Sequence, residues 1–236
     1  MKRTVAFMIV IFGLLFGTEL FGADWPQFRY NAGRTAASPE ELSEQLYLQW
    51  IWEFGAPRPA FPREVRLLFD ASYEPVVVGK TMFVPSMVND SVTALDTVTG
   101  AERWRFYTEG PVRFAPVAWQ DKVYFVSDDG YLYCLAAVDG RLNWKFRGLP
   151  AGHEDRKLFG DGRLVSVFPA RGGPVLADGI IYLAAGIWSD EGVFVHALNA
   201  ETGQVVWSNT CSDRINWANS DHGVAAIVMK VSLPMT

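Results

Sequence analysis

The chain has 236 residues, with 21 Lys and Arg against 26 Asp and Glu, so its formal net charge is −5. This acidic balance argues against nucleic acid as a partner, because binding to a phosphate backbone depends on clustered Lys and Arg. Half of the residues are hydrophobic and 9 are tryptophan, a composition that agrees with a globular protein.

Residues 1–23 have the layout of a signal peptide: two basic residues after the first methionine, an apolar run, and small residues before Asp24. The apolar run covers about 13 residues, fewer than the roughly 20 that a membrane helix needs. We therefore expect export to the periplasm or the exterior of a bacterium, with no membrane span after cleavage. Phe21 fits a small-residue cleavage site poorly, so an uncleaved anchor is the alternative.

Residues 24–72 do not repeat and are expected to form a lead-in segment. A serine N-cap followed by proline and glutamate predicts a short helix from Ser38 to about Leu46. The run 50–54, Trp-Ile-Trp-Glu-Phe, resembles the ends of later units and predicts the last strand of an incomplete unit. The stretch 56–69 is rich in proline and arginine and is expected to be a linker or loop.

Residues 73–210 contain three copies of one pattern, in which a tryptophan follows a glycine by four positions. The pairs are Gly100 with Trp104, Gly140 with Trp144, and Gly203 with Trp207. The first two copies are 40 residues apart, and several short strands in such a period indicate a β-propeller. The sequence therefore predicts an all-β fold, a partial β-propeller of four-stranded antiparallel blades with about three recognisable blades and incomplete ones.

The second unit shows how the strands of a blade follow one another. Residues 122–127 and 131–136 are predicted to pair as a hairpin around Asp-Asp-Gly, and residues 141–146 form the next strand. The glycine of each pair is expected to have the left-handed backbone of a tight turn. We interpret the tryptophans as structural, because a ring that buries on the order of 200 Å² can fill the wedge between blades.

The pattern Ala-x-Asp-x-x-Thr-Gly-x-x-x-Trp resembles the docking motif of pyrroloquinoline quinone (PQQ)-type β-propellers. It is matched well at 94–104 and 197–207 and loosely at 134–144. The opening Asp-Trp-Pro-Gln-Phe-Arg at 24–29 is similar to that of secreted bacterial PQQ-like repeat proteins. The propeller of the outer-membrane protein assembly machinery belongs to the same group.

An insertion at 149–171 displaces the third unit. Long loops on one face of a propeller commonly build a binding surface, so the insertion is the candidate interaction loop. Its candidate contact residues are His153, Glu154, Asp155, Arg163 and Arg171. The alternative is that these charges only solvate an exposed loop.

The resemblance implies two possible functions. The first is a non-catalytic scaffold that binds protein partners and needs no catalytic residue, cofactor or metal. The second is the N-terminal part of a quinoprotein oxidoreductase, whose PQQ and Ca²⁺ would be bound by residues outside this chain. The chain lacks the adjacent cysteines that the resemblance would require at a PQQ site, and its three histidines lack metal-ligand spacing.

Residues 211–236 carry no fourth copy and are expected to be a truncated blade. Because propellers of the type it resembles usually close with more blades, we expect the chain to be an N-terminal portion of a longer protein. Export would permit a disulfide between Cys134 and Cys211, but two cysteines alone do not establish one.

Overall fold

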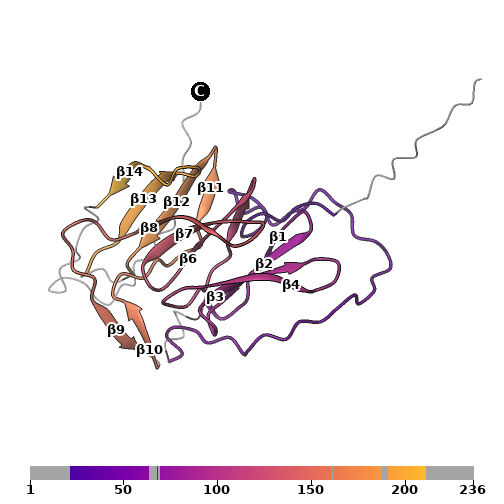
Figure 1. The fold of residues 1–236 in the computed structure, drawn as a ribbon, viewed down its shortest axis with the longest axis horizontal. Coiled ribbons are helices and arrows are strands. Elements are labelled where there is room, and N and C mark those ends of the chain that lie inside the picture. Colours follow the sequence, from indigo (N-terminus) through magenta and orange to yellow (C-terminus); the bar gives the residue numbers. More distant parts are fainter. Residues whose placement is uncertain (1–21, 64–67, 69, 161, 188–190, 211–236) are drawn as a thin grey trace, which may run out of the picture.

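The computed structural model describes residues 22–63, 68, 70–160, 162–187 and 191–210. These residues form three four-stranded antiparallel sheets and one two-stranded sheet, and none of them is in an α-helix. Figure 1 shows the three larger sheets following one another in chain order. The predicted all-β fold of four-stranded antiparallel blades is confirmed.

Each large sheet is one blade, and its strands lie in the order of the sequence. The first blade consists of β1 (Val76–Val78), β2 (Thr81–Ser86), β3 (Ser91–Asp96) and β4 (Glu102–Tyr107). The second consists of β5 (Val117–Trp119), β6 (Lys122–Val126), β7 (Tyr131–Ala136) and β8 (Leu142–Arg147). The third consists of β11 (Val175–Ala177), β12 (Ile180–Ala185), β13 (Phe194–Asn199) and β14 (Val205–Asn209).

The same irregularity recurs in all three blades, where the third strand pairs with the fourth. The register shifts after Ala94 in the first blade, after Cys134 in the second and after Ala197 in the third. A bulge of this kind bends a strand and increases its local twist. The repeat in the sequence therefore specifies a repeated backbone distortion as well as a repeated set of strands.

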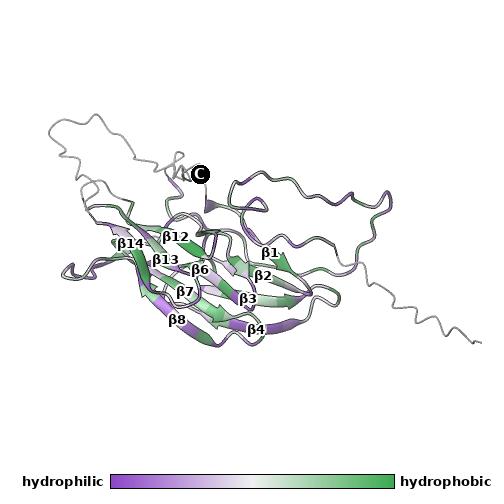
Figure 2. Cartoon of the chain, turned by 90° about the horizontal axis from the view of Figure 1, so that it is seen from above, coloured by the Kyte–Doolittle hydropathy of each residue, from purple (hydrophilic) through white to green (hydrophobic). Residues whose placement is uncertain are grey.

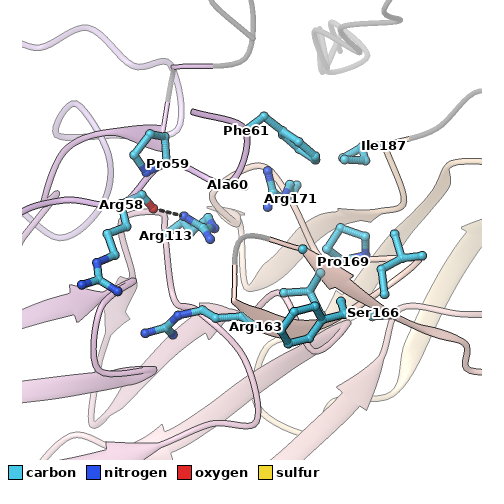
Figure 3. Close-up of a pocket in the computed structure, with 14 residues that line it drawn as sticks. Arg58, Pro59, Ala60, Phe61, Arg113, Arg163, Ser166, Pro169, Arg171 and Ile187 are labelled. Carbon is cyan, nitrogen blue, oxygen red and sulfur yellow. Dashed lines mark hydrogen bonds between the residues drawn. The ribbon is translucent and has the colours of Figure 1, made fainter. Parts of the chain in front are cut away.

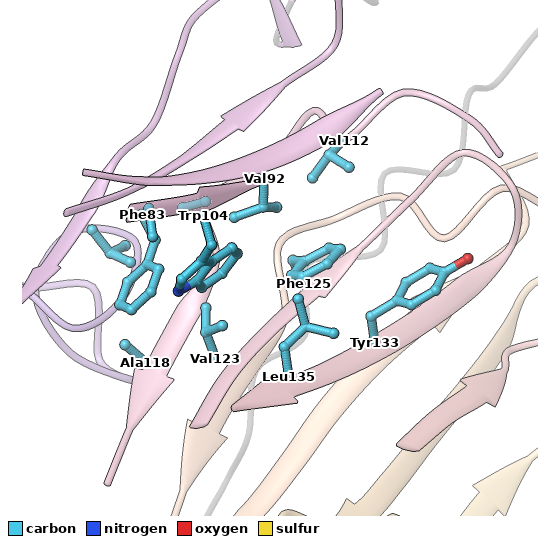
Figure 4. Packing of buried hydrophobic residues seen from close by; sticks show 12 residues of the cluster. Phe83, Val92, Trp104, Val112, Ala118, Val123, Phe125, Tyr133 and Leu135 are labelled. Carbon is cyan, nitrogen blue, oxygen red and sulfur yellow. The ribbon is translucent and has the colours of Figure 1, made fainter. Parts of the chain in front are cut away.

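Hydrophobic side chains fill the spaces between neighbouring blades. One cluster joins the first two blades and includes Phe83, Trp104 and Phe125 (Figure 4). A second cluster joins the second and third blades and includes Tyr124 and Ile181. Figure 2 shows that the outer strands β4 and β8 are more hydrophilic than β2 and β12. The core is thus built at the blade interfaces, where burial of apolar surface drives the packing.

Residues 24–27 connect the first strands of all three blades. Trp25 exchanges two backbone hydrogen bonds with Val77 of β1, at 2.7 and 2.9 Å. The carbonyl of the next residue accepts a hydrogen bond from the N–H of Ala118 in β5 at 2.8 Å. The side-chain amide of Gln27 then donates to, and accepts from, the backbone of the central residue of β11 at 3.4 and 3.2 Å. We call residues 24–27 the N-terminal strap.

Two predictions for the lead-in segment need correction. The predicted helix from Ser38 to Leu46 is wrong, because this stretch is irregular and exposed, with Leu42 84% exposed. A short helix gains little stability without a surface on which to pack an apolar face. The run 50–54 is also not a strand in the structure, although Trp50 makes a contact of the blade type that is described below.

Several predictions concern residues outside the described part of the chain. The signal-peptide residues 1–21 and the C-terminal segment 211–236, which includes Cys211, lie outside it. Cys134 lies on β7 and is buried. Among the described residues, no helix is long and apolar enough to cross a membrane.

Candidate functional site

The repeat tryptophans join one blade to the glycine turn of the next. A Cβ atom placed on Gly140 would lie 2.7 Å from the ring of Trp104, and one placed on Gly203 would lie 2.7 Å from Trp144. The two indole N–H groups donate to backbone carbonyls in the same turns, at 2.9 and 3.1 Å. The glycine and tryptophan that pair in sequence therefore act in two different interfaces, because each tryptophan packs on the following blade.

The two ends of the array differ. Trp50 lies on Gly100 in the manner of the other pairs, with a closest approach of 2.8 Å to a Cβ atom placed there. At the other end, Trp207 of β14 is 45% exposed, and its ring lies 6.3 Å from that of Tyr182 in the same blade. The lead-in segment thus covers the turn of the first blade, whereas the outer face of the third blade is open within the described residues.

The long connections between blades converge beside the insertion. A hairpin of β9 (Lys157–Gly160) and β10 (Arg163–Ser166) forms inside it and carries part of the predicted interaction loop. The backbone N–H of Ser166 donates to the carbonyl of Asp128 in the β6–β7 turn at 2.9 Å. The base of the hairpin is therefore fixed to the second blade.

Four charged side chains form a buried cluster at this junction. Asp128 accepts hydrogen bonds from Arg113 at 2.6 Å and from Arg171 at 2.9 and 3.2 Å. Asp70 lies 3.3 Å from Arg113 and 3.7 Å from Arg171. The two positive and two negative charges balance, and removal of one would leave an uncompensated charge in the interior. Arg171, a predicted contact residue, is thus part of a buried ion-pair cluster.

A cavity of about 180 Å³ lies next to this cluster, between segment 58–61 and the hairpin (Figure 3). Among the residues that the structure describes, its lining includes four arginines and no Asp or Glu. The arginines are Arg58, Arg113, Arg163 and Arg171. The carbonyl of Arg58 accepts a hydrogen bond from Arg113 at 2.6 Å, which ties the lead-in segment to the second blade. The remaining lining is mostly apolar, including Phe61 and Pro169.

The β9–β10 hairpin presents apolar side chains to solvent. Leu158 and Leu164 are exposed, and Phe159 is 77% exposed at the edge of the cavity. Polar anchors hold the hairpin in place, since Arg163 pairs with Asp90 of the first blade and also donates to the backbone of the same β2–β3 connection. Exposed apolar side chains on a rigid support are typical of a protein-binding surface. The sequence analysis missed these three residues, whose signal is the two apolar pairs at 158–159 and 164–165 within a charged insertion.

The other predicted contact residues have different surroundings. His153 packs edge-on against the rings of Phe168 and Phe194, at centroid distances of 6.4 and 5.3 Å. Asp155 accepts a hydrogen bond from Ser166 at 3.2 Å, and Glu154 is exposed. The structure therefore brings Arg163 and Arg171 to the cavity and places the other three at the base and surface of the insertion.

Burial dominates the pKa shifts of two carboxylates near the site. Burial raises the pKa of Asp90, and the neighbouring Arg163 opposes that rise. Burial also raises the pKa of Asp129, whose carboxylate accepts a hydrogen bond from Tyr133 at 2.7 Å. Within the described ranges, no three His, Cys, Asp or Glu side chains are grouped so that they could hold a metal ion.

A family model described as "Outer membrane protein assembly factor BamB" matches residues 49–172, just over half of the chain. Among curated proteins, the dehydrogenase subunit of alcohol dehydrogenase (quinone) from Gluconacetobacter polyoxogenes is 30% identical over 146 residues. That match covers 56% of this chain and 19% of the relative. The same subunit from Komagataeibacter europaeus is also 30% identical, with 18% of the relative covered.

Solved structures show the same fold over most of the chain. Quinohemoprotein alcohol dehydrogenase from Comamonas testosteroni has a TM-score of 0.58 at 23% identity, with 79% of this chain and 27% of that chain covered. A europium-containing methanol dehydrogenase has a TM-score of 0.54 at 20% identity, with 78% and 31% covered. The chain thus spans less than a third of each of these structures, and at this identity the likeness concerns the fold alone.

Proposed function

The chain belongs to the family of outer membrane protein assembly factor BamB, and from that premise we propose that it is an exported, non-catalytic propeller segment that binds protein partners. The observation that carries the proposal is the β9–β10 hairpin, which presents exposed apolar side chains beside an arginine-lined cavity. In this function the blades supply rigidity, and the connections between them supply the contacts.

Site-specific crosslinking tests the proposal. A photo-reactive amino acid at position 159 should give discrete crosslinked adducts in cells that export the protein, because Phe159 is at the exposed edge of the hairpin. The matched control is position 138, since Val138 is 80% exposed in the β7–β8 connection, away from the cavity lining. Equal adducts at both positions, or none at position 159, would contradict the proposal. Fractionation of the same cells tests export, which predicts a periplasmic or extracellular chain.

An oxidoreductase is the second candidate function, because the chain is 30% identical to a quinone alcohol dehydrogenase subunit over the matched residues. In that case the chain would supply blades to an oxidoreductase that uses PQQ and Ca²⁺. The cavity beside the hairpin does not by itself support such a site, because its volume of about 180 Å³ is below the roughly 300 Å³ of small-molecule sites. No grouping of three candidate metal ligands occurs in the described ranges either.

Fluorescence separates the two functions. The purified chain, titrated with PQQ in the presence of Ca²⁺, should show no saturable quenching of its tryptophans if it is a protein-binding segment. Saturable quenching by low micromolar PQQ in a folded sample would favour the oxidoreductase. Size-exclusion chromatography and circular dichroism on the same sample establish that the chain is folded.

A further inference from the structure

We propose that the cavity beside the β9–β10 hairpin binds a carboxylate carried by an apolar segment of a partner polypeptide. The inference rests on the proposed function, because it names the chemistry of the group that a protein partner would insert. Three properties of the cavity carry it: the charge of its lining, an unpaired guanidinium N–H, and an apolar wall of limited size.

The charged residues that line the cavity are basic, whereas the chain as a whole is acidic. The formal net charge of the chain is −5, yet the described residues that line the cavity include four arginines and no acidic residue. The carboxylates that pair with three of these arginines belong to Asp70, Asp90 and Asp128, none of which lines the cavity. These carboxylates balance three of the arginines, and the one excess positive charge belongs to Arg58, whose side chain is exposed. A cleft with apolar walls concentrates such a field and favours an anionic group.

Arg171 retains hydrogen-bonding capacity. Its side chain is 4% exposed, and its Nη1 has no hydrogen-bond partner. The carboxylate of Asp70 is 3.7 Å from Nη1, too far for a good hydrogen bond. The ring of Phe61 lies 5.0 Å from the guanidinium carbon and fixes the orientation of the group (Figure 3). A guanidinium binds carboxylates through its N–H groups, so a further carboxylate, in addition to those of Asp70 and Asp128, would meet this unsatisfied donor.

The apolar part of the cavity lining favours a ligand that carries an apolar side chain next to that carboxylate. Phe61, Pro169 and Ile187 line the interior, while Leu158 and Phe159 of β9 extend the apolar surface to the exposed edge. A bound segment could therefore bury an aliphatic or aromatic side chain against the hairpin, and transfer of that side chain from water favours binding.

The size of the cavity limits the inserted group to about one residue. A volume of about 180 Å³ is below the roughly 300 Å³ at which small-molecule sites begin. A polypeptide offers such a carboxylate from two sources, its C-terminal residue or the side chain of Asp or Glu. Both sources present the same chemistry to Arg113 and Arg171.

Three fluorescent peptides distinguish these sources when they are titrated against the purified chain. The first is Gly-Ser-Gly-Ser-Val-Leu with a free C-terminal carboxylate, and the second is the same peptide with a C-terminal amide. The third is the amide with glutamate in place of the second serine. We expect the first or the third to bind at least about tenfold more tightly than the second, a difference of ~1.4 kcal/mol. The tighter of the two identifies the source, and its affinity should fall as salt is raised.

Variants assign the binding to the cavity. Phe159→Ser changes an exposed side chain and should fold normally, yet it should weaken the tight peptide about fivefold or more through lost apolar contact. Arg171→Gln should remove the preference for a carboxylate over the amide, provided that circular dichroism shows a folded chain. Val138→Ser, which changes an equally exposed apolar residue away from the cavity, should leave all three affinities unchanged.

The outcomes separate this inference from the proposed function. Equal binding of the three peptides, or no saturable binding to a folded chain, overturns the carboxylate site. If crosslinks still form at position 159 in that case, the protein-binding function stands without this site. Carboxylate-dependent binding that Phe159→Ser leaves unchanged also overturns the inference, because it places the binding elsewhere.

Discussion

The indole of Trp50 lies on Gly100, and its Nε1–H donates to the carbonyl of Thr97 at 2.9 Å. Trp50 belongs to no strand, yet it makes the contact that Trp104 makes with the next blade. The lead-in segment therefore occupies the turn that another blade would otherwise cover.

The contact between Trp104 and Gly140 predicts that adding one methyl group at position 140 lowers the stability of the chain strongly. Gly140→Ala should destabilise the chain by about 2–5 kcal/mol, because it combines a left-handed backbone, at φ +73°, with a Cβ atom in the indole. The control is Gly79→Ala, whose φ is +54° and whose Cβ atom would meet nothing within 4 Å. Urea unfolding should show a loss of about 1 kcal/mol for this control. Equal losses for the two variants would show that the backbone conformation alone matters.

The N-terminal strap predicts that a residue far from the third blade in the sequence stabilises that blade. Gln27→Ala should lower the free energy of unfolding by about 1–2 kcal/mol, because it leaves the backbone N–H and carbonyl of Leu176 without their side-chain partners. Hydrogen exchange should report faster opening of β11 in this variant. Gln204→Ala, at an exposed glutamine, is the control and should leave that exchange unchanged.

The buried ion-pair cluster predicts a strong loss on removal of one carboxylate. Asp128→Ala should destabilise the chain by about 3–5 kcal/mol, because Arg113 and Arg171 would keep buried charges without their main acceptor. Chemical unfolding measures the loss. The control is Asp121→Ala, which removes an exposed partner of Lys122 and should change stability little. A small effect of Asp128→Ala would mean that water or Asp70 can replace the carboxylate.

His196 predicts a dependence of stability on pH. The ring lies between the hydroxyl of Ser208 at 2.7 Å and the carbonyl of Gly148 at 2.8 Å, and burial lowers its pKa. The unfolded chain therefore takes up a proton more readily than the folded chain. Stability should fall as the pH drops below the ordinary histidine pKa of about 6.5. Unfolding at pH 7.5 and 5.5 measures the fall, which His196→Gln should reduce. An equal fall in both proteins would assign it to other groups.

The sequence by itself determined the blades. The interval of 40 residues between Gly100 and Gly140, together with the alternating strands and glycine turns, specified four-stranded units with predictable hairpins. These features could be predicted because they depend on residues close together in the chain. Local pattern alone also misled, since the cap residues at Ser38 predicted a helix that no neighbouring surface stabilises.

Only the tertiary structure decided how the units meet and where a ligand could bind. Gln27 reaches Leu176 across 149 positions, and Arg171 reaches Asp128 across 43, so neither contact leaves a signal in local periodicity. The cavity likewise combines segment 58–61 with the β9–β10 hairpin, which are far apart in the sequence and meet only in the tertiary structure. Strand formation follows local conformational preference, whereas the strap, the ion-pair cluster and the cavity depend on long-range packing.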